Sequence, residues 1–232
     1  MRTILASELI EISERGARLG NASRALLLLE AGGEIDAQDA AALPLGARDR
    51  LLLRLRAALF GERMVAQQQC AACGENYELS LCAADVGLGD LPTSATAPCL
   101  HLDDDGTPYR VRALTAGDMV AAEAAPDVAA ALTMLLRRAA PDAPGDAVTA
   151  ARISETVEAL DPDAEVLLSA RCPACGHGVE HALDVPGFVW REIEQRVPRI
   201  LREVADLARL YHWSERDILA MPAARRRFYL SV

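Results

Sequence analysis

Two short cysteine motifs constrain the fold of this chain more than any other feature of its sequence. Each has the form Cys-x-x-Cys-Gly, and 98 residues lie between the last cysteine of the first motif and the first cysteine of the second. Four thiolates can complete the tetrahedral coordination shell of a zinc ion. If both motifs bind the same ion, the chain must leave after the first, build another structure and return beside it. The four candidate metal ligands are Cys70, Cys73, Cys172 and Cys175.

The residues around each motif predict β-hairpins with the cysteines at their tips. Tyr77, Leu79 and Leu81 alternate with polar residues, which is typical of a strand. An apolar run at 166–168 precedes the second motif, and residues 179–185 can form a strand after it. The Gly that follows each motif suits a turn, because glycine readily adopts positive φ. Two such hairpins sharing one Zn²⁺ per chain form a zinc ribbon.

Separate or redox-active cysteines are the alternative to a shared zinc site. A thioredoxin-type Cys-x-x-Cys would open a helix, but Gly and strand-like residues follow both motifs here. A disulfide framework suits a small secreted chain, whereas this chain has 232 residues and no signal-peptide pattern. Cys82 and Cys99 lack ligand spacing, so we interpret them as buried apolar residues.

Residues 177–181 also fit the H-x-x-E-H pattern of one class of zinc peptidase. That pattern needs a helix to bring both histidines onto one face. Gly178 and the strand-like residues around it argue against a helix here. We therefore expect Glu180 and His181 to be structural or solvent-facing rather than catalytic.

Composition narrows the classes of partner. With 34 acidic and 24 basic residues the net charge is −10, which opposes a general role on nucleic acid or a lipid surface, since both are anionic. No apolar run approaches the roughly 20 residues that cross a bilayer. The unpaired-thiol chemistry fits a reducing, cytoplasmic setting. P-loop, dinucleotide, nucleophile-elbow and kinase motifs are absent from the sequence, so we expect neither catalysis nor a small-molecule substrate.

The periodicity predicts an α+β fold in three parts. Residues 1–62 form a helical unit, with helices over 3–15, 23–29, 36–43 and 47–60, the second capped by Ser23 and the third by Asp36. In the last of these, the arginines are predicted to form a solvated face, with a partner contact as the alternative. Residues 63–185 form the zinc-ribbon core, interrupted by an insertion at about 86–163. The insertion is predicted to hold a β-hairpin over 99–113, a helix beginning at Ala116 and capped by Thr115, and helices after Pro126 and at Thr149.

Residues 186–232 are predicted to form a C-terminal helical arm. Pro198 should kink or restart its first helix, Ser214 should cap a second, and Pro222 should open a third. The end of the arm combines aromatic and basic residues, which are favoured at protein interfaces. The alternatives are aromatics that close the chain's own core and a cationic helix end favoured by the helix dipole. The candidate partner-binding residues are Trp213, Arg225, Arg226, Arg227, Phe228 and Tyr229.

Three stretches together resemble a known family. Residues 43–56 (LPLGARDRLLLRLR), continuing to Phe60 and Gly61, are similar to a segment of T4-type baseplate hub proteins and hub assembly chaperones of contractile-tailed phages and phage-derived injection systems. The second stretch is CPACG at 172–176, leading to Leu183, Asp184 and FVWREI at 188–193. The third is YHWSERDIL at 211–219 with RRRFYL at 225–230, which resembles the C-terminal helix pair of injection-system members.

The resemblance implies a non-enzymatic baseplate component or assembly chaperone that contacts hub, spike or tube proteins. Two departures limit what can be transferred. The first knuckle has Ala71 where the family pattern has Pro, and the insertion at 86–163 matches least well. The alternative function is a zinc-ribbon adaptor that binds nucleic acid or transcription machinery, which a filter-binding assay over a salt series would reveal. A zinc hydrolase is a third class, but it requires an open metal position.

Overall fold

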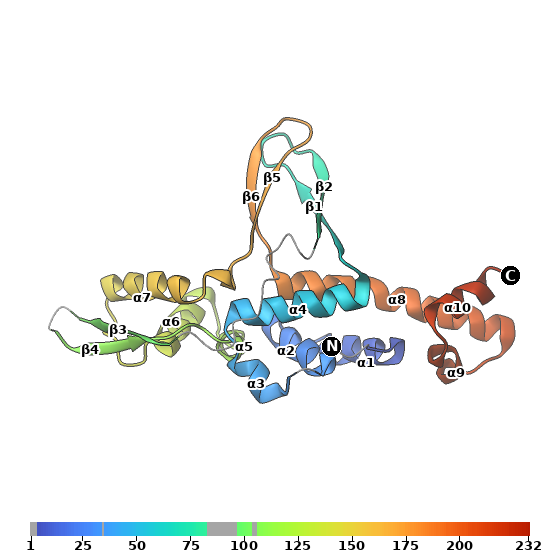
Figure 1. The fold of residues 1–232 in the computed structure, drawn as a ribbon, viewed down its shortest axis with the longest axis horizontal. Helices are drawn as coiled ribbons and strands as arrows, with labels where there is room; N and C mark the ends of the chain where they lie inside the picture. The colour runs from blue at the N-terminus through green and yellow to red at the C-terminus, as the bar shows by residue number, and fades with distance from the viewer. Residues whose placement is uncertain (1–3, 34, 83–96, 104–105) are drawn as a thin grey trace.

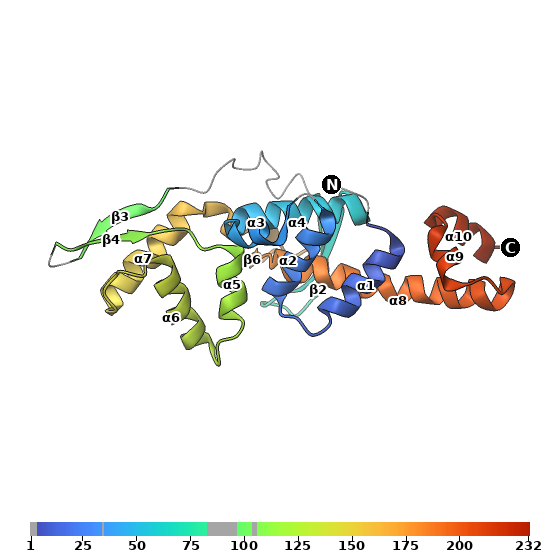
Figure 2. The ribbon, with the colours of Figure 1, turned by 90° about the horizontal axis from the view of Figure 1, so that it is seen from below.

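The computed structural model describes residues 4–33, 35–82, 97–103 and 106–232. A helical body lies at the centre, and two hairpins stand upright from it (Figure 1). The insertion lies at one end of the long axis and the C-terminal arm at the other, and the view from below shows the same order (Figure 2). This arrangement of helices with small antiparallel hairpins confirms the predicted α+β class. None of the helices within these described ranges is long and apolar enough to cross a membrane.

The body owes its stability to apolar burial between helices near both ends of the chain. Leu28, Leu52, Trp190 and Ile193 are almost completely buried in one continuous core. Gly16 allows the indole of Trp190 to approach helix α1, since a Cβ there would clash with the ring. The helices of the body are α1 (Ala6–Gly16), α2 (Asn21–Gly32), α3 (Ala37–Ala42), α4 (Leu45–Phe60) and α8 (Val185–Tyr211).

Two helix predictions fail for identifiable reasons. The second helix begins at Asn21 after Gly20, and the predicted cap Ser23 lies inside it, where its hydroxyl donates to Glu123 of the insertion at 2.7 Å. Of the kink or restart predicted at Pro198, the restart does not occur, and α8 continues through it to Tyr211. Val197 and Ile200 are buried on either side of Pro198, so tertiary packing holds the helix together where local propensity would end it. The predicted cap Asp36 is confirmed and accepts from the Asp39 N–H.

The solvated arginine face predicted on α4 is wrong. Arg56 is 2% exposed, and Arg48 is buried beside Asp49. The guanidinium of Arg56 donates to both carboxylate oxygens of Glu192 on α8, at 2.6 and 2.7 Å, and also to the Arg63 carbonyl at 2.8 Å. Burial raises the pKa of Asp49, although Arg48 opposes this shift. The ion pair between Arg56 and Glu192 therefore fixes the start of the first hairpin against the longest helix.

The two hairpins have the predicted architecture. The first pairs β1 (Arg63–Gln69) with β2 (Asn76–Cys82), and the second pairs β5 (Leu167–Arg171) with β6 (Gly178–Ala182). Both are antiparallel, and each closes just below its cysteine turn, where Gln69 faces Asn76 and Arg171 faces Gly178. Their tips meet at the top of the molecule (Figure 1).

The insertion has a small core of its own, centred on Tyr109, Val111 and Ile153. Its helix α5 packs against the body, and Glu123 after α5 accepts from the Ala22 N–H of α2 at 2.5 Å. Thr115 caps α5 as predicted. The first residues of the insertion and the middle of its acidic turn, at 83–96 and 104–105, lie outside the described residues. The elements are β3 (Cys99–Leu102), β4 (Pro108–Val111), α5 (Ala116–Ala122), α6 (Val128–Ala139), α7 (Ala147–Leu160) and the 3-10 helix η2 (Pro162–Ala164).

The end of the arm folds back on α8. Helices α9 (Glu215–Ala220) and α10 (Ala223–Leu230) follow a turn at His212, which has positive φ. Ser214 caps α9 as predicted, and Pro222 immediately precedes α10. Ile218 is fully buried against the body's core cluster, so the arm is attached by packing as well as by the chain.

Candidate metal centre

The two cysteine turns have the same backbone hydrogen bonds. In the first, the Cys70 N–H donates to the Glu75 carbonyl and the Gly74 N–H to the Cys70 carbonyl, both at 2.8 Å. In the second, Cys172 bonds to His177 and Gly176 to Cys172 in the same way, both at 2.9 Å. Gly74 and Gly176 have φ of 76° and 73°, values that a residue with a Cβ rarely adopts. Each turn thus presents two thiols on one side of the hairpin tip.

The structure brings the four predicted ligands together. All four Sγ atoms lie within 4.8 Å of one another. The separation is 3.7 Å between Cys70 and Cys175 and also 3.7 Å between Cys73 and Cys172. A tetrahedral ion with metal–sulfur bonds of about 2.3 Å would require sulfurs about 3.8 Å apart. All four cysteines are free thiols, so they are spaced for one metal ion shared between the hairpins.

Burial alternates in the same order in both turns. Cys70 and Cys172 are buried between the hairpins, whereas Cys73 and Cys175 face outward. Tyr77 and Ala170 pack against the two buried cysteines. Across the described ranges, this is the single group of His, Cys, Asp or Glu side chains close enough to hold a metal. The centre is therefore shielded on its inner side and reachable from solvent on its outer side.

Four crowded thiols cannot all carry negative charge without a cation. The Cys73 N–H stabilises the thiolate of Cys70 and lowers its pKa to about 6, despite burial. The Glu75 N–H favours the thiolate of Cys73, but the Cys175 thiol, burial and the other two thiols outweigh it and raise the pKa of Cys73 to about 12. The protein alone thus favours ionisation of one thiol over another. A bound dication would stabilise all four thiolates together.

The number of sulfur ligands decides what chemistry a bound metal could perform. When all four thiolates coordinate, the tetrahedral shell is complete and leaves no position for an activated water. The H-x-x-E-H stretch begins at His177 in the second cysteine turn and continues along strand β6, so it lacks the helix that such a motif needs. His181 instead lies near the Tyr77 hydroxyl, with 3.3 Å between Nε2 and Oη. These residues connect the two hairpins below the thiols.

The remaining cysteines are not buried, contrary to the prediction. Cys82 ends β2 on the same side as Glu78 and Ser80, and all three are exposed. Cys99 begins β3 and is also exposed. Strand alternation explains the exposure of Cys82, which lies on the outward face of β2. Cys99 is paired with the buried Val111 and so lies on the inward face of its hairpin, where its place at the first residue of β3 leaves it exposed.

The six candidate partner-binding residues fall into two groups. Trp213 and Tyr229 are half-buried and form an aromatic cluster with Tyr211, with ring centroids 4.6 to 5.7 Å apart. Arg226 is 3% exposed and donates to Glu203 of α8 at 3.1 Å. The other three, Arg225, Arg227 and Phe228, are exposed, and Phe228 is 63% exposed.

Comparison of the chain with protein-family models, with curated proteins and with solved structures gives no match. The site is therefore interpreted from its own geometry. Sequence reasoning missed the buried ion pair of Arg56 and Glu192. A signal for the burial of Arg56, though not for its partner, was present, since Arg56 lies four residues after the buried Leu52 and hence on the same helix face.

Proposed function

We propose that the four thiols hold one structural Zn²⁺ that joins the hairpins. The observation that carries this proposal is the set of four Sγ atoms within 4.8 Å of one another. Sulfur ligands favour soft or borderline metals, and a closed tetrahedral set of four is typical of structural zinc. In the reducing cytoplasm such thiols remain available for a metal.

We propose further that the protein is a non-enzymatic baseplate component or hub assembly chaperone of a contractile tail or injection system. The three stretches that resemble that family support this proposal. Stretches one and two are joined by the ion pair between Arg56 and Glu192. The third forms the end of the arm. The segments that carry the resemblance therefore belong to one connected scaffold: α4, the second knuckle with α8, and the helices that pack on α8.

The arm is the proposed contact with hub, spike or tube proteins. Trp213, Tyr229 and Arg226 hold α10 against the molecule, which leaves Phe228 and its exposed basic neighbours Arg225 and Arg227 pointing outward. An exposed aromatic beside arginines has the composition of an interface hot spot. The packed candidates Trp213, Arg226 and Tyr229 thus position the exposed candidates Arg225, Arg227 and Phe228.

To test this role, the gene in its native cluster is replaced by a copy that encodes Phe228→Asp, and the particles are examined by electron microscopy. This substitution is preferable to deletion of residues 212–232, because deletion would uncover the apolar surface around Ile218. We expect few or no assembled baseplate hubs, whereas Val148→Asp, at an exposed position on α7, should yield normal particles. Normal contractile particles with folded Phe228→Asp protein would contradict the proposed role of the arm.

A further inference from the structure

Helix α6 keeps most of its apolar face uncovered. Val128, Leu132, Leu135 and Leu136 recur at helical spacing, yet Val128 is 84% exposed and Leu132 54% exposed. Ala139 is the only residue of α6 that is fully buried. A core-facing helix would bury this stripe. The stripe therefore forms one wall of an open apolar surface.

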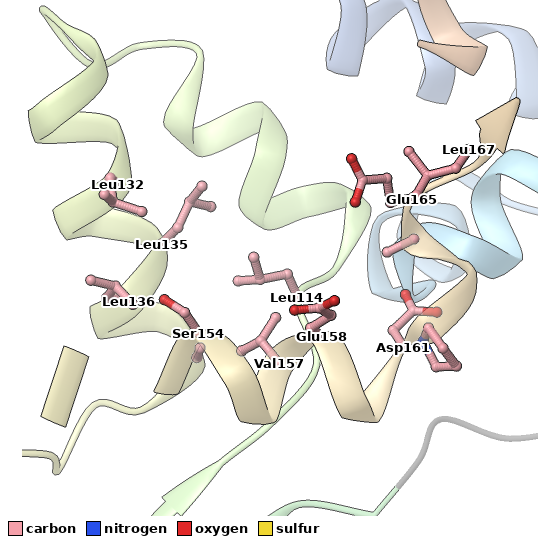
Figure 3. Close-up of a pocket in the computed structure, with 13 residues that line it drawn as sticks. Leu114, Leu132, Leu135, Leu136, Ser154, Val157, Glu158, Asp161, Glu165 and Leu167 are labelled. Carbon is pink, nitrogen blue, oxygen red and sulfur yellow. The ribbon is translucent and has the colours of Figure 1, made fainter. Parts of the chain in front are cut away.

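The stripe borders a groove of about 420 Å³ between α6, α7 and the start of β5. Figure 3 shows Leu132, Leu135 and Leu136 at one end, with Leu114 and Val157 in the middle. Glu158 of α7 lies beside Leu114 and Val157, and Glu165, after η2, lies toward the opposite end near Leu167 (Figure 3). Glu158 and Glu165 are exposed, and neither forms an ion pair with a cation in the described part of the chain. The groove thus offers an apolar wall and unneutralised carboxylates beside and beyond it.

The arm has the complementary chemistry. Phe228 and Arg225 are three residues apart on α10, so an exposed aromatic and an exposed cation share one side of that helix. Along the sequence, charge also differs between the insertion and the C-terminal segment. Residues 86–163 contain thirteen acidic and five basic residues, a net charge of −8, whereas residues 186–232 contain nine arginines and six acidic residues, a net charge of +3.

We propose that the groove binds helix α10 of a second copy of this chain. The same chain cannot supply it, because its arm lies at the opposite end of the long axis (Figure 1). Phe228 enters the apolar part of the groove, and Arg225 faces Glu158 and Glu165. Since each copy has one groove and one arm, the contact is head-to-tail and each added copy leaves a free groove and a free arm. Such an interface builds rings or open chains rather than closed two-fold dimers.

This inference rests on one premise of the proposed function, that the exposed side of α10 is a contact surface, and it assigns that surface to another copy of the chain in the protein free of hub, spike or tube proteins. It is tested on the purified full-length protein alone, so its failure is distinct from failure of the baseplate proposal, which is tested in particles. Sedimentation velocity over a concentration series should show association beyond the monomer. Raising the salt should weaken association, since the contact includes exposed charges.

Two single variants test the two halves of the contact. Phe228→Ser removes the aromatic side chain that enters the groove, and Leu132→Ser places a polar side chain in the groove wall. Each should raise the dissociation constant of association at least tenfold. Both positions are exposed, so both variants should keep the far-UV circular dichroism and metal content of the original protein. Leu210→Ser, at another exposed apolar position on α8, is the matched control and should associate normally.

Mixing the two variants gives the sharpest result. Phe228→Ser retains an intact groove, and Leu132→Ser retains an intact arm, so an equimolar mixture should form a heterodimer and nothing larger. A charge exchange adds an independent test: Arg225→Glu and Glu158→Arg should each weaken association, and the double variant should regain at least part of it. A protein that stays monomeric at the highest attainable concentration overturns the inference. So does association that Leu132→Ser leaves unchanged, or a mixture that remains monomeric.

Discussion

The helical body and the ribbon are stabilised in opposite ways. The body buries a continuous set of apolar side chains, most of them Leu, Ile and Val, from five helices and the arm, together with Met64 at the base of the first hairpin. The core of the ribbon consists of Cys70, Tyr77 and Cys172, with Ala170 packed against them. Each hairpin is two-stranded, and isolated two-stranded hairpins are at best marginally stable in water. We therefore expect the tips of the ribbon to depend on the proposed metal for the stability that the body obtains from apolar burial.

This difference predicts that the two regions can be destabilised separately. The body brings Phe60 and Val185 near the base of the hairpins without help from the metal, through the packing of α4 on α8. Loss of the metal should then release the hairpin tips while the helices persist. Damage to the core should have the reverse effect.

The largest effect is expected from Trp190→Ala. The indole is 1% exposed, lies under the Arg24 guanidinium at 4.6 Å and donates to Glu194 at 2.6 Å. Its removal leaves a cavity in the body and should lower the free energy of unfolding by about 3–5 kcal/mol. Urea denaturation followed by circular dichroism at 222 nm measures this loss. Metal content should not change, and a variant that loses metal in parallel would show that the two regions are not independent.

A somewhat smaller effect is expected from Arg56→Met. The substitution leaves the Glu192 carboxylate without its cation at a site where the Arg56 side chain is 3% exposed. Breaking such a buried pair should cost about 3 kcal/mol. Arg209→Met is the control, since its pair with Asp206 is exposed and should contribute less than about 1 kcal/mol. Equal stability losses in the two variants would mean that Arg56 does not join the hairpin to α8.

A third prediction concerns acid stability of the insertion. Burial alone would raise the pKa of Asp118, but hydrogen bonds from Arg112 and the Thr115 N–H lower it to about 2. When folding lowers the pKa of a carboxyl group, that group stabilises the folded state at pH values above its ordinary pKa. This contribution to stability is lost as the pH falls from about 4 to 2. Asp118→Asn should therefore cost about 1–2 kcal/mol at pH 7, and the difference should shrink below pH 4. The check is thermal unfolding of both proteins between pH 2.5 and 7.

The control for that series is Asp142→Asn, at an exposed position in the loop before α7. It should match the original protein at every pH. An Asp118→Asn penalty that stays constant down to pH 2.5 would show that the loss comes from packing rather than from ionisation.

Local patterns predicted the ribbon and most helix ends. Paired Cys-x-x-Cys turns and strand alternation are encoded within a few residues, and so are the caps at Asp36, Thr115 and Ser214. The four-cysteine cluster could be predicted because both halves carry the same local signature. Long-range contacts explain the errors. The burial of Arg56 depends on Glu192, and that of Arg226 on Glu203, and neither partner is identified by spacing.

The uncovered face of α6 shows most clearly what the sequence pattern could not predict. Its periodicity predicts an amphipathic helix, and the structure contains one. The pattern does not specify whether the apolar face meets the chain's own core or remains open. That outcome depends on how α7 and the short η2 segment are placed, which is a tertiary property.

The most direct test of the central claim is the metal content and coordination of the purified protein. Elemental analysis should find about one zinc ion per chain, and X-ray absorption should find four sulfur ligands at about 2.3 Å. Changing Cys172 and Cys175 together to Ser should abolish tight binding and speed hydrogen exchange in β1, β2, β5 and β6, with little change in the helical signal. Full zinc occupancy in that double variant would contradict a single ion shared between the hairpins.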